Sequence, residues 1–212
     1  MKLKNTIILA FLLFALTATS LAQAKKRIDY IETTTIELGT KATTTTSIEE
    51  QKPVLHKTVI TLNDVSVSVS DANVGGGTLI YTFPEGRIWI MGSIAVSVTP
   101  TTTSTLASTL NASSTLSVGV GTVQTTTQAS GTLATTQQDL VAAFAATSSA
   151  TINVAGTAGN GILAASAFFD GTSTAKTAYL NVGVPTATDI DGNATVTFTG
   201  TVTIYWAKLG DY

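Results

Sequence analysis

The sequence ATVTFTGTVTIYW, residues 194–206, decides the fold class of this chain. Small, aliphatic or large aromatic side chains stand at every second position, and threonine or tyrosine stands between them. This alternation is typical of a long β-strand that buries one face and exposes the other. Gly200 falls on the apolar face, where a missing side chain predicts a bulge, a bend or another backbone packed close by.

Two further stretches predict strands before this one. The sequence DVSVSVS at residues 64–70 alternates in the same way and predicts a half-buried strand. Residues 78–83 and 87–98, joined by a Pro-Glu-Gly turn, predict a hairpin. The second strand of this hairpin is apolar on both faces around Trp89, so we expect it to be central in a sheet or to lie at an interface.

The rest of the chain is expected to be mostly β as well. Further strands are predicted at residues 116–123, 152–155, 161–169 and 178–184. Asp170-Gly171 marks the turn between the last two of them.

One short helix is expected around Leu140, Val141 and Phe144, because apolar residues recur there at helical spacing after the acidic residue Asp139. Apart from it, many short strands are separated by Gly, Pro and Asp turns. We therefore predict an all-β protein with a single antiparallel β-sandwich or jelly-roll-like domain.

The composition divides the chain into three parts. Residues 1–24 are an apolar segment like a signal peptide, residues 25–53 an arm or linker, and residues 54–212 the β-sandwich domain. The arm is rich in threonine and charge and has few apolar residues, so we expect it to become ordered only on binding a partner.

The first part has the organisation of an export signal. Lys2 and Lys4 precede an apolar run at residues 7–16, and LAQA at residues 21–24 ends in an Ala-x-Ala pattern that predicts cleavage after Ala24. The apolar run is too short for a stable transmembrane helix, which needs about 20 apolar residues. No membrane span is expected after Ala24 either. The alternative is an apolar arm or core segment of a cytoplasmic assembly protein that only resembles an export signal.

The composition excludes several classes of function. Of the 212 residues, 44% are hydrophobic and only 11% are charged, and about a fifth are threonine. The formal net charge of −2 gives no positive field for phosphate backbones, so no nucleic-acid partner is expected. The chain has no cysteine and one histidine, His56, which excludes disulfides, thiolate nucleophiles and most zinc and Ser-His sites.

Several motifs that suggest chemistry have simpler interpretations. The stretch at residues 189–193 begins like a calcium loop, but its twelfth position is Gly200 instead of a bidentate glutamate, so we interpret it as a turn. Gly75-Gly76-Gly77 lacks the lysine and helix that follow a phosphate-binding loop. His56 is expected in packing or at the surface, and Glu49-Glu50 as solvated charge. No catalytic, cofactor-binding or metal-binding residue, no cofactor and no small-molecule substrate is predicted.

Residues 88–175 contain no lysine or arginine and only two acids, Asp139 and Asp170. The surface of that half must therefore consist of threonine, serine, glycine and alanine. An uncharged β surface has a low desolvation cost on association and leaves strand edges unprotected. We expect a homo-oligomer or a subunit of a larger shell.

Four blocks of sequence carry a family resemblance. They are YTFPEGRI at residues 81–88, FDGTSTAK at 169–176, YLNVGVP at 179–185 and TVTIYWAKLGDY at 201–212. As a set they resemble a family of small, mostly uncharacterised proteins of tailed bacteriophages. The resemblance implies a virion structural or capsid-decoration role and no catalytic residue. Residues 1–24 depart from the family, because virion proteins normally assemble in the host cytoplasm without an export signal.

Two functions follow as expectations. The first is a non-enzymatic virion structural protein, a capsid-decoration or other head- or tail-associated subunit, whose partners are itself and other virion proteins. The alternative is a secreted or cell-surface bacterial β-sandwich protein, adhesin-like or of the envelope, released by cleavage after Ala24. An exported hydrolase is disfavoured, because one histidine and scattered carboxylates make a poor catalytic site.

Overall fold

The computed structural model describes residues 31–39, 55–103, 114–126, 128, 130–190 and 192–210. The chain divides between Glu32 and Thr33 into two units, and all the described residues after Glu32 belong to the second. None of the helical turns in this described part is long and apolar enough to cross a membrane.

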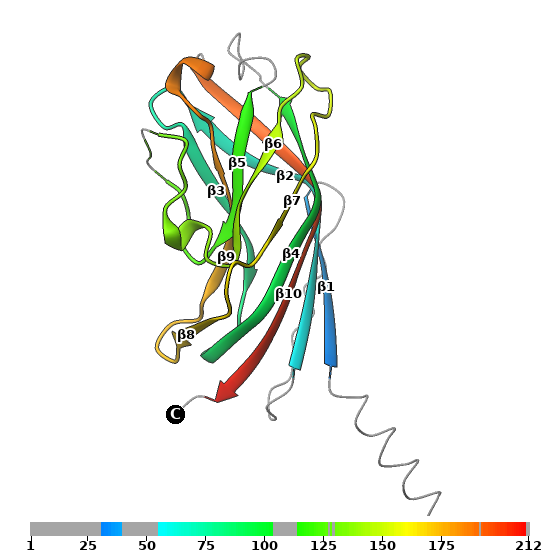
Figure 1. Cartoon of the computed structure of the whole chain (residues 1–212), viewed down its shortest axis with the longest axis vertical. Coiled ribbons are helices and arrows are strands. Elements are labelled where there is room, and N and C mark those ends of the chain that lie inside the picture. The colour runs from blue at the N-terminus through cyan, green and yellow to red at the C-terminus, as the bar shows by residue number, and fades with distance from the viewer. Residues whose placement is uncertain are drawn as a thin grey trace, which may run out of the picture. The chain divides into compact units, whose positions relative to one another are not determined.

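The described residues build two antiparallel sheets (Figure 1). The larger, sheet A, has the strand order β1 (Ile31–Gly39), β2 (Leu55–Ser70), β10 (Asn193–Gly210), β4 (Gly86–Thr103) and β7 (Gly159–Ile162), and β8 (Ala167–Gly171) also pairs with β4. The smaller, sheet B, has the order β3 (Gly75–Thr82), β9 (Thr177–Gly183), β5 (Thr115–Gly121) and β6 (Val141–Thr147). The predicted all-β fold is confirmed.

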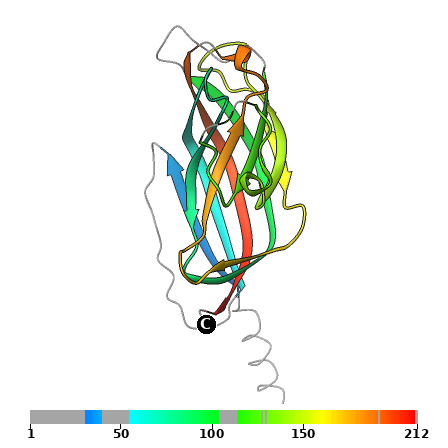
Figure 2. The ribbon, with the colours of Figure 1, turned by 90° about the vertical axis from the view of Figure 1, so that its left-hand side faces the viewer.

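The strand predicted from residues 194–206 is part of β10, the central strand of sheet A. Figure 2 shows β10, in red, running between β2 and β4. β4, whose sequence is apolar on both faces, is also central, because it pairs with β10 on one edge and with β7 and β8 on the other.

The predicted helix is wrong. Val141 and Phe144 belong to β6, and the helical turn before it is the short 3-10 turn η1 (Thr135–Gln137). β6 pairs with β5 through Val118 and Phe144, so it completes an edge of sheet B. This pairing outweighs the local helical spacing, because tertiary context overrides weak propensity.

Two strand predictions also need correction. Residues 152–155 form exposed turns instead of a strand, and Asn153 there has a left-handed φ of 63°. Residues 161–169, expected to be one strand, belong to two, β7 and β8, which pair one after the other with the same edge of β4. Both stretches contain large apolar residues that are exposed, so apolar composition did not indicate a buried strand there.

Part of the expected arm is a strand. β1 pairs with β2 at the edge of sheet A, and Leu38 packs against the core. The rest of residues 25–53 and all of residues 1–24 lie outside the described residues, so the leader and its cleavage after Ala24 stay predictions.

Extra residues shift the alternation of β2 and β4 beside Gly200. In β2 the buried side chains stand at even positions up to Leu62 and at odd positions from Val65. In β4 they change from odd to even positions between Ala95 and Val98. β10 keeps its phase, and the register to both neighbours slips at Gly200. Each extra residue is a bulge. Because it changes which positions face inward, the apolar side chains on both sides of the bulge point to the core.

The backbone at these bulges is left-handed in all three strands. φ is 58° at Asp64, 53° at Ser97 and 136° at Gly200. A Cβ at Gly200 would lie 2.7 Å from the carbonyl oxygen of Ser97 and 2.9 Å from the Cα of Val98. Glycine is therefore required here both by its φ and by the approach of β4, which confirms the predicted irregularity.

The hydrophobic core fills the space between the two sheets. Sheet A contributes Ile60, Leu62, Val65, Val67, Val69, Ile88, Ile90, Ala95, Val98, Val196, Phe198, Val202, Ile204 and Trp206. Sheet B contributes Ile80, Leu116, Val118, Val120, Val141, Ala178, Leu180 and Val182.

Aromatic rings pack the core near the C-terminal end of β10. His56 and Trp206 are cross-strand partners, and their rings stack with centroids 4.1 Å apart. Phe83 packs edge-on against Trp206 at 5.5 Å. The indole Nε1–H of Trp206 donates to Oγ1 of the buried Thr58 at 2.9 Å, so the polar group of this ring is satisfied.

We expect Trp206→Ala and Phe198→Ala each to lower the free energy of unfolding by about 3–5 kcal/mol, because both side chains are fully buried and leave cavities. Thr199→Ala, on the other face of the same strand, should cost less than about 1 kcal/mol. Chemical denaturation measures all three, and equal losses on both faces would contradict this assignment of faces.

We expect Gly200→Ala to lower the free energy of unfolding by about 1–3 kcal/mol, the cost of a residue held in a disfavoured backbone conformation. Gly92→Ala in β4 is the matched control, because a Cβ there would meet no heavy atom within 4 Å. It should stay within about 0.5 kcal/mol of wild type. Urea titration decides, and a wild-type midpoint for Gly200→Ala would refute the argument.

Candidate interaction surface

The acidic side chains and the histidine of the described residues do not gather into a metal site. No group of three or more His, Cys, Asp or Glu side chains there is placed to hold a metal ion. His56 is buried against Trp206, so its ring takes part in packing. Asp189 accepts a hydrogen bond from the backbone N–H of Thr186 at 3.3 Å, within a turn. Three acids discussed in the sequence lie outside the described residues: Glu49, Glu50 and Asp191.

Two carboxylates hold loops in place. Asp139 accepts hydrogen bonds from the backbone N–H and the hydroxyl of Thr122, each at 2.7 Å. Desolvation by burial raises the pKa of Asp139, and the bonds from Thr122 oppose that rise. Asp170 accepts bonds from the hydroxyl and the backbone N–H of Thr172, which lower the pKa of its carboxyl. Both groups are engaged in local structure.

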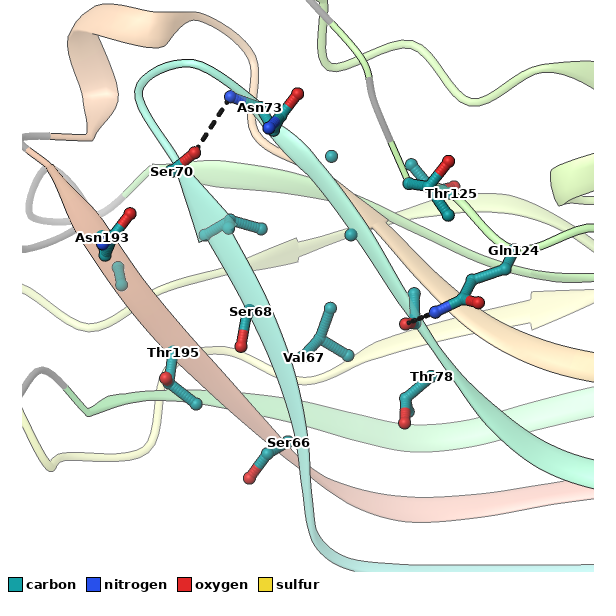
Figure 3. Close-up of a pocket in the computed structure, with 16 residues that line it drawn as sticks. Ser66, Val67, Ser68, Ser70, Asn73, Thr78, Gln124, Thr125, Asn193 and Thr195 are labelled. Carbon is teal, nitrogen blue, oxygen red and sulfur yellow. Dashed lines mark hydrogen bonds between the residues drawn. The ribbon is translucent and has the colours of Figure 1, made fainter.

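A groove of about 680 Å³ opens between β2, β3, β10 and the loop after β5 (Figure 3). Its lining contains hydroxyls, amides, glycines and small apolar groups but no titratable side chain. Figure 3 shows Gln124 reaching to β3, where its amide donates to the carbonyl oxygen of Gly77 at 2.6 Å. At one end, the backbone N–H of Asn73 donates to Oγ of Ser70 at 3.1 Å.

The glycines of this groove are explained by packing within the chain. A Cβ at Gly76 would lie 2.2 Å from the carbonyl oxygen of Ser68, and one at Gly77 would lie 2.2 Å from Oδ1 of Asn181. Asn181 is fully buried, and its Oδ1 accepts the backbone N–H of Thr125 at 2.9 Å. The triplet therefore lets β3 approach β2 and the buried amide.

The outer face of sheet A, opposite the core, carries apolar side chains in cross-strand rows. One row crosses four strands through the register pairs Leu55–Ala207, Ala207–Trp89 and Trp89–Phe168. The rings of Trp89 and Phe168 stack with centroids 5.5 Å apart. Phe168 is 68% exposed and Leu55 is 43% exposed, so the row is open to solvent at both ends.

A second row runs parallel to the first. It crosses four strands through the pairs Val59–Thr203, Thr203–Ile94 and Ile94–Ile162. Ile162 is 63% exposed, and Tyr205, which lies on β10 between the two rows, is 40% exposed. We call the two rows and this tyrosine the outer apolar face: Leu55, Val59, Trp89, Ile94, Ile162, Phe168, Thr203, Tyr205 and Ala207. Exposed apolar side chains gathered on one face in this way mark association sites.

The sequence predicted this surface only in part. The apolar character of residues 87–98 on both faces indicated a central or interfacial strand, and β4 places Trp89 and Ile94 on the outer face. The rows themselves were missed, because the bulges decide which residues share a face. They also depend on β7 and β8 pairing with the same edge of β4.

Three of the four blocks that resemble the phage family meet near the C-terminal end of β10. The backbone N–H of Phe83 donates to the carbonyl oxygen of Lys176 at 2.8 Å, and Gly86 pairs with Gly171. Phe83 also packs against Trp206 of the last block. The residue pattern of these blocks thus follows from the packing of this end of the sandwich.

No protein-family model matches the sequence, and a search of curated proteins gives no match. Among solved structures, the chain is similar to a chain of the cyanophage Pam1 capsid asymmetric unit, with 16% sequence identity and a TM-score of 0.27. The similarity covers 79% of this chain and 94% of that one. A likeness with these values carries no argument about function.

We expect Asp139→Ala to lower the free energy of unfolding by about 1–3 kcal/mol, because two donors of Thr122 lose their acceptor. Asp139→Asn should retain most of the stability, since an amide can accept the N–H and donate to the hydroxyl.

The same pair of proteins should differ in pH dependence. A raised pKa means that folded Asp139 binds its proton more tightly than the unfolded chain does, so its contribution to stability grows as pH falls through the folded pKa. Wild type should therefore gain stability relative to Asp139→Asn on acidification from neutral pH. A relative loss in the denaturation midpoints would show that the sign is wrong.

Proposed function

We propose that this chain is a non-enzymatic virion structural protein, a capsid-decoration or other head- or tail-associated subunit that assembles through its β domain. The observation that carries the proposal is the outer apolar face. Its side chains lie in register on neighbouring strands, with Phe168 and Ile162 the most exposed large apolar residues described. Scattered exposed apolar residues are ordinary, but contiguous rows on one face favour association.

The charge distribution supports assembly. All of β7 and β8 and most of β4 fall within residues 88–175, which carry only two acids and no base. Bringing such a surface out of water requires little desolvation of charge, so shape and apolar area determine the binding. The partners proposed are the chain itself and other virion proteins, with no nucleic acid, cofactor or small-molecule substrate.

The choice of a virion over other assemblies rests on the four sequence blocks that resemble the tailed-phage family. Residues 1–24 favour a second candidate, because a basic start, an apolar run and an Ala-x-Ala pattern are typical of an exported protein. That candidate is a secreted or cell-surface bacterial β-sandwich protein, adhesin-like or of the envelope.

The two candidates are separated by finding where the chain resides. Phage particles from the producing culture are purified on a density gradient, and peptides of the chain are quantified by mass spectrometry in particle, medium and envelope fractions. We expect the chain to co-purify with the capsid proteins, and an abundant host protein serves as the control for carry-over.

The N-terminal peptide gives an independent result in the same samples. Recovery of the chain mainly in the medium or envelope, with its first residue at Lys25, would overturn the virion proposal and support export. Co-purification with particles at the level of the control host protein would also count against it.

A further inference from the structure

The packing of the described residues does not explain why position 92 is a glycine. At each of the other glycines whose surroundings are described, an added Cβ would lie within 3.0 Å of another atom, whereas at Gly92 it would meet nothing within 4 Å. Its φ is not left-handed either. Glycine inside a strand weakens it and often marks a bulge or the close approach of a ligand or another backbone. The register between β4 and β10 does shift next to Gly92, but without a left-handed φ this irregularity does not require a glycine. None of the described atoms approaches the open side of Gly92.

Gly92 forms a notch in the middle of the outer apolar face. It pairs with Tyr205, which places it between the row through Trp89 and Phe168 and the row through Ile94 and Ile162. The notch is therefore bordered by apolar side chains on β4, β7, β8 and β10. The position that a Cβ of residue 92 would take is free of described atoms within 4 Å, so there is room there for an atom of an outside side chain.

A pair of opposite charges lies at the margin of this face and is complementary to the same pair of a second copy. Arg87 and Asp170 are exposed cross-strand partners one step beyond Trp89 and Phe168, on the same side of the sheet. In a face-to-face pair, a two-fold axis that runs along the strands between β4 and β8 would place Arg87 of one copy opposite Asp170 of the other, as an isologous contact requires. The ammonium of Lys57 lies over the Tyr205 ring at 5.9 Å, and its long side chain can remain at the rim.

We propose that the outer apolar face binds the same face of a second copy of this chain, with an exposed apolar side chain of one copy entering the Gly92 notch of the other. The inference rests on the proposed function, because it names the contact through which the subunit assembles. Two sheets packed face to face lie about 10 Å apart, a distance that interdigitating aliphatic and aromatic side chains fill.

The test measures self-association of the full chain by light scattering over a range of micromolar concentrations. Wild type should be a dimer or a higher even oligomer. Phe168→Glu should weaken association by about 30-fold or more, because it replaces the most exposed apolar side chain of the face by a charge. Leu79→Glu on sheet B is the matched control, because Leu79 is also half-exposed, and it should associate like wild type.

Gly92→Val is the discriminating variant. It fills the notch, so we expect association to weaken about tenfold, as overpacking of a fitted site does. The denaturation midpoint of the dilute, monomeric protein should not fall, because the new Cβ has open space and valine suits a strand. Such a loss of association without a loss of stability would not be seen if the residue served only the fold.

Three outcomes would overturn the inference: a monomeric wild type, association unaffected by Phe168→Glu and Gly92→Val, or an equal effect of Leu79→Glu. A monomeric wild type whose Phe168→Glu variant fails to join particles would show that the face binds another virion protein instead of a second copy. The presence of wild type in purified particles is measured separately, so the proposed function can stand while this inference fails.

Discussion

The structure depends on the matched bulges that β2 and β4 form on either side of Gly200. Three strands of sixteen or eighteen residues have to keep their apolar side chains on one side of a twisted sheet over their whole length. Asp64 in β2 and Ser97 in β4 have left-handed backbone, which accommodates one extra residue in each of these two strands. Gly200 in β10, which lies between them, leaves room for the displaced backbone of β4. Without this room, one half of β2 or β4 would turn its apolar side chains to solvent.

The same bulges create the surface to which we assign a function. Because they set the phase of each strand, they decide that Trp89 and Phe168 lie on the outer face while Ile88 and Ile90 lie in the core. A second slip in register between β10 and β4, next to Tyr205, places Gly92 on that outer face as well. The core and the outer apolar face are thus two results of one pattern of insertions.

The sequence was sufficient to predict the fold class and β10, because an uninterrupted period-two pattern can be recognised without knowing which strands pair. It was not sufficient for β2, of which only residues 64–70 were predicted, since the phase change after Leu62 hides the first half of the strand. It failed around Phe144, where pairing with Val118 decides the structure. The outer apolar face could not be predicted for the same reason: its members come from five strands, and its rows exist only once the register is known.

Residues that the fold explains give little information about function. Phe83, Gly86 and Trp206 belong to blocks that resemble a phage family, yet each is held by contacts within this chain, so any protein with this end of the sandwich would need similar residues. Gly92 is different, because an added Cβ there would meet no described atom within 4 Å, and a residue with a side chain would suit the strand better. Under the self-association proposed above, this open space is the place where a side chain of the second copy would approach β4.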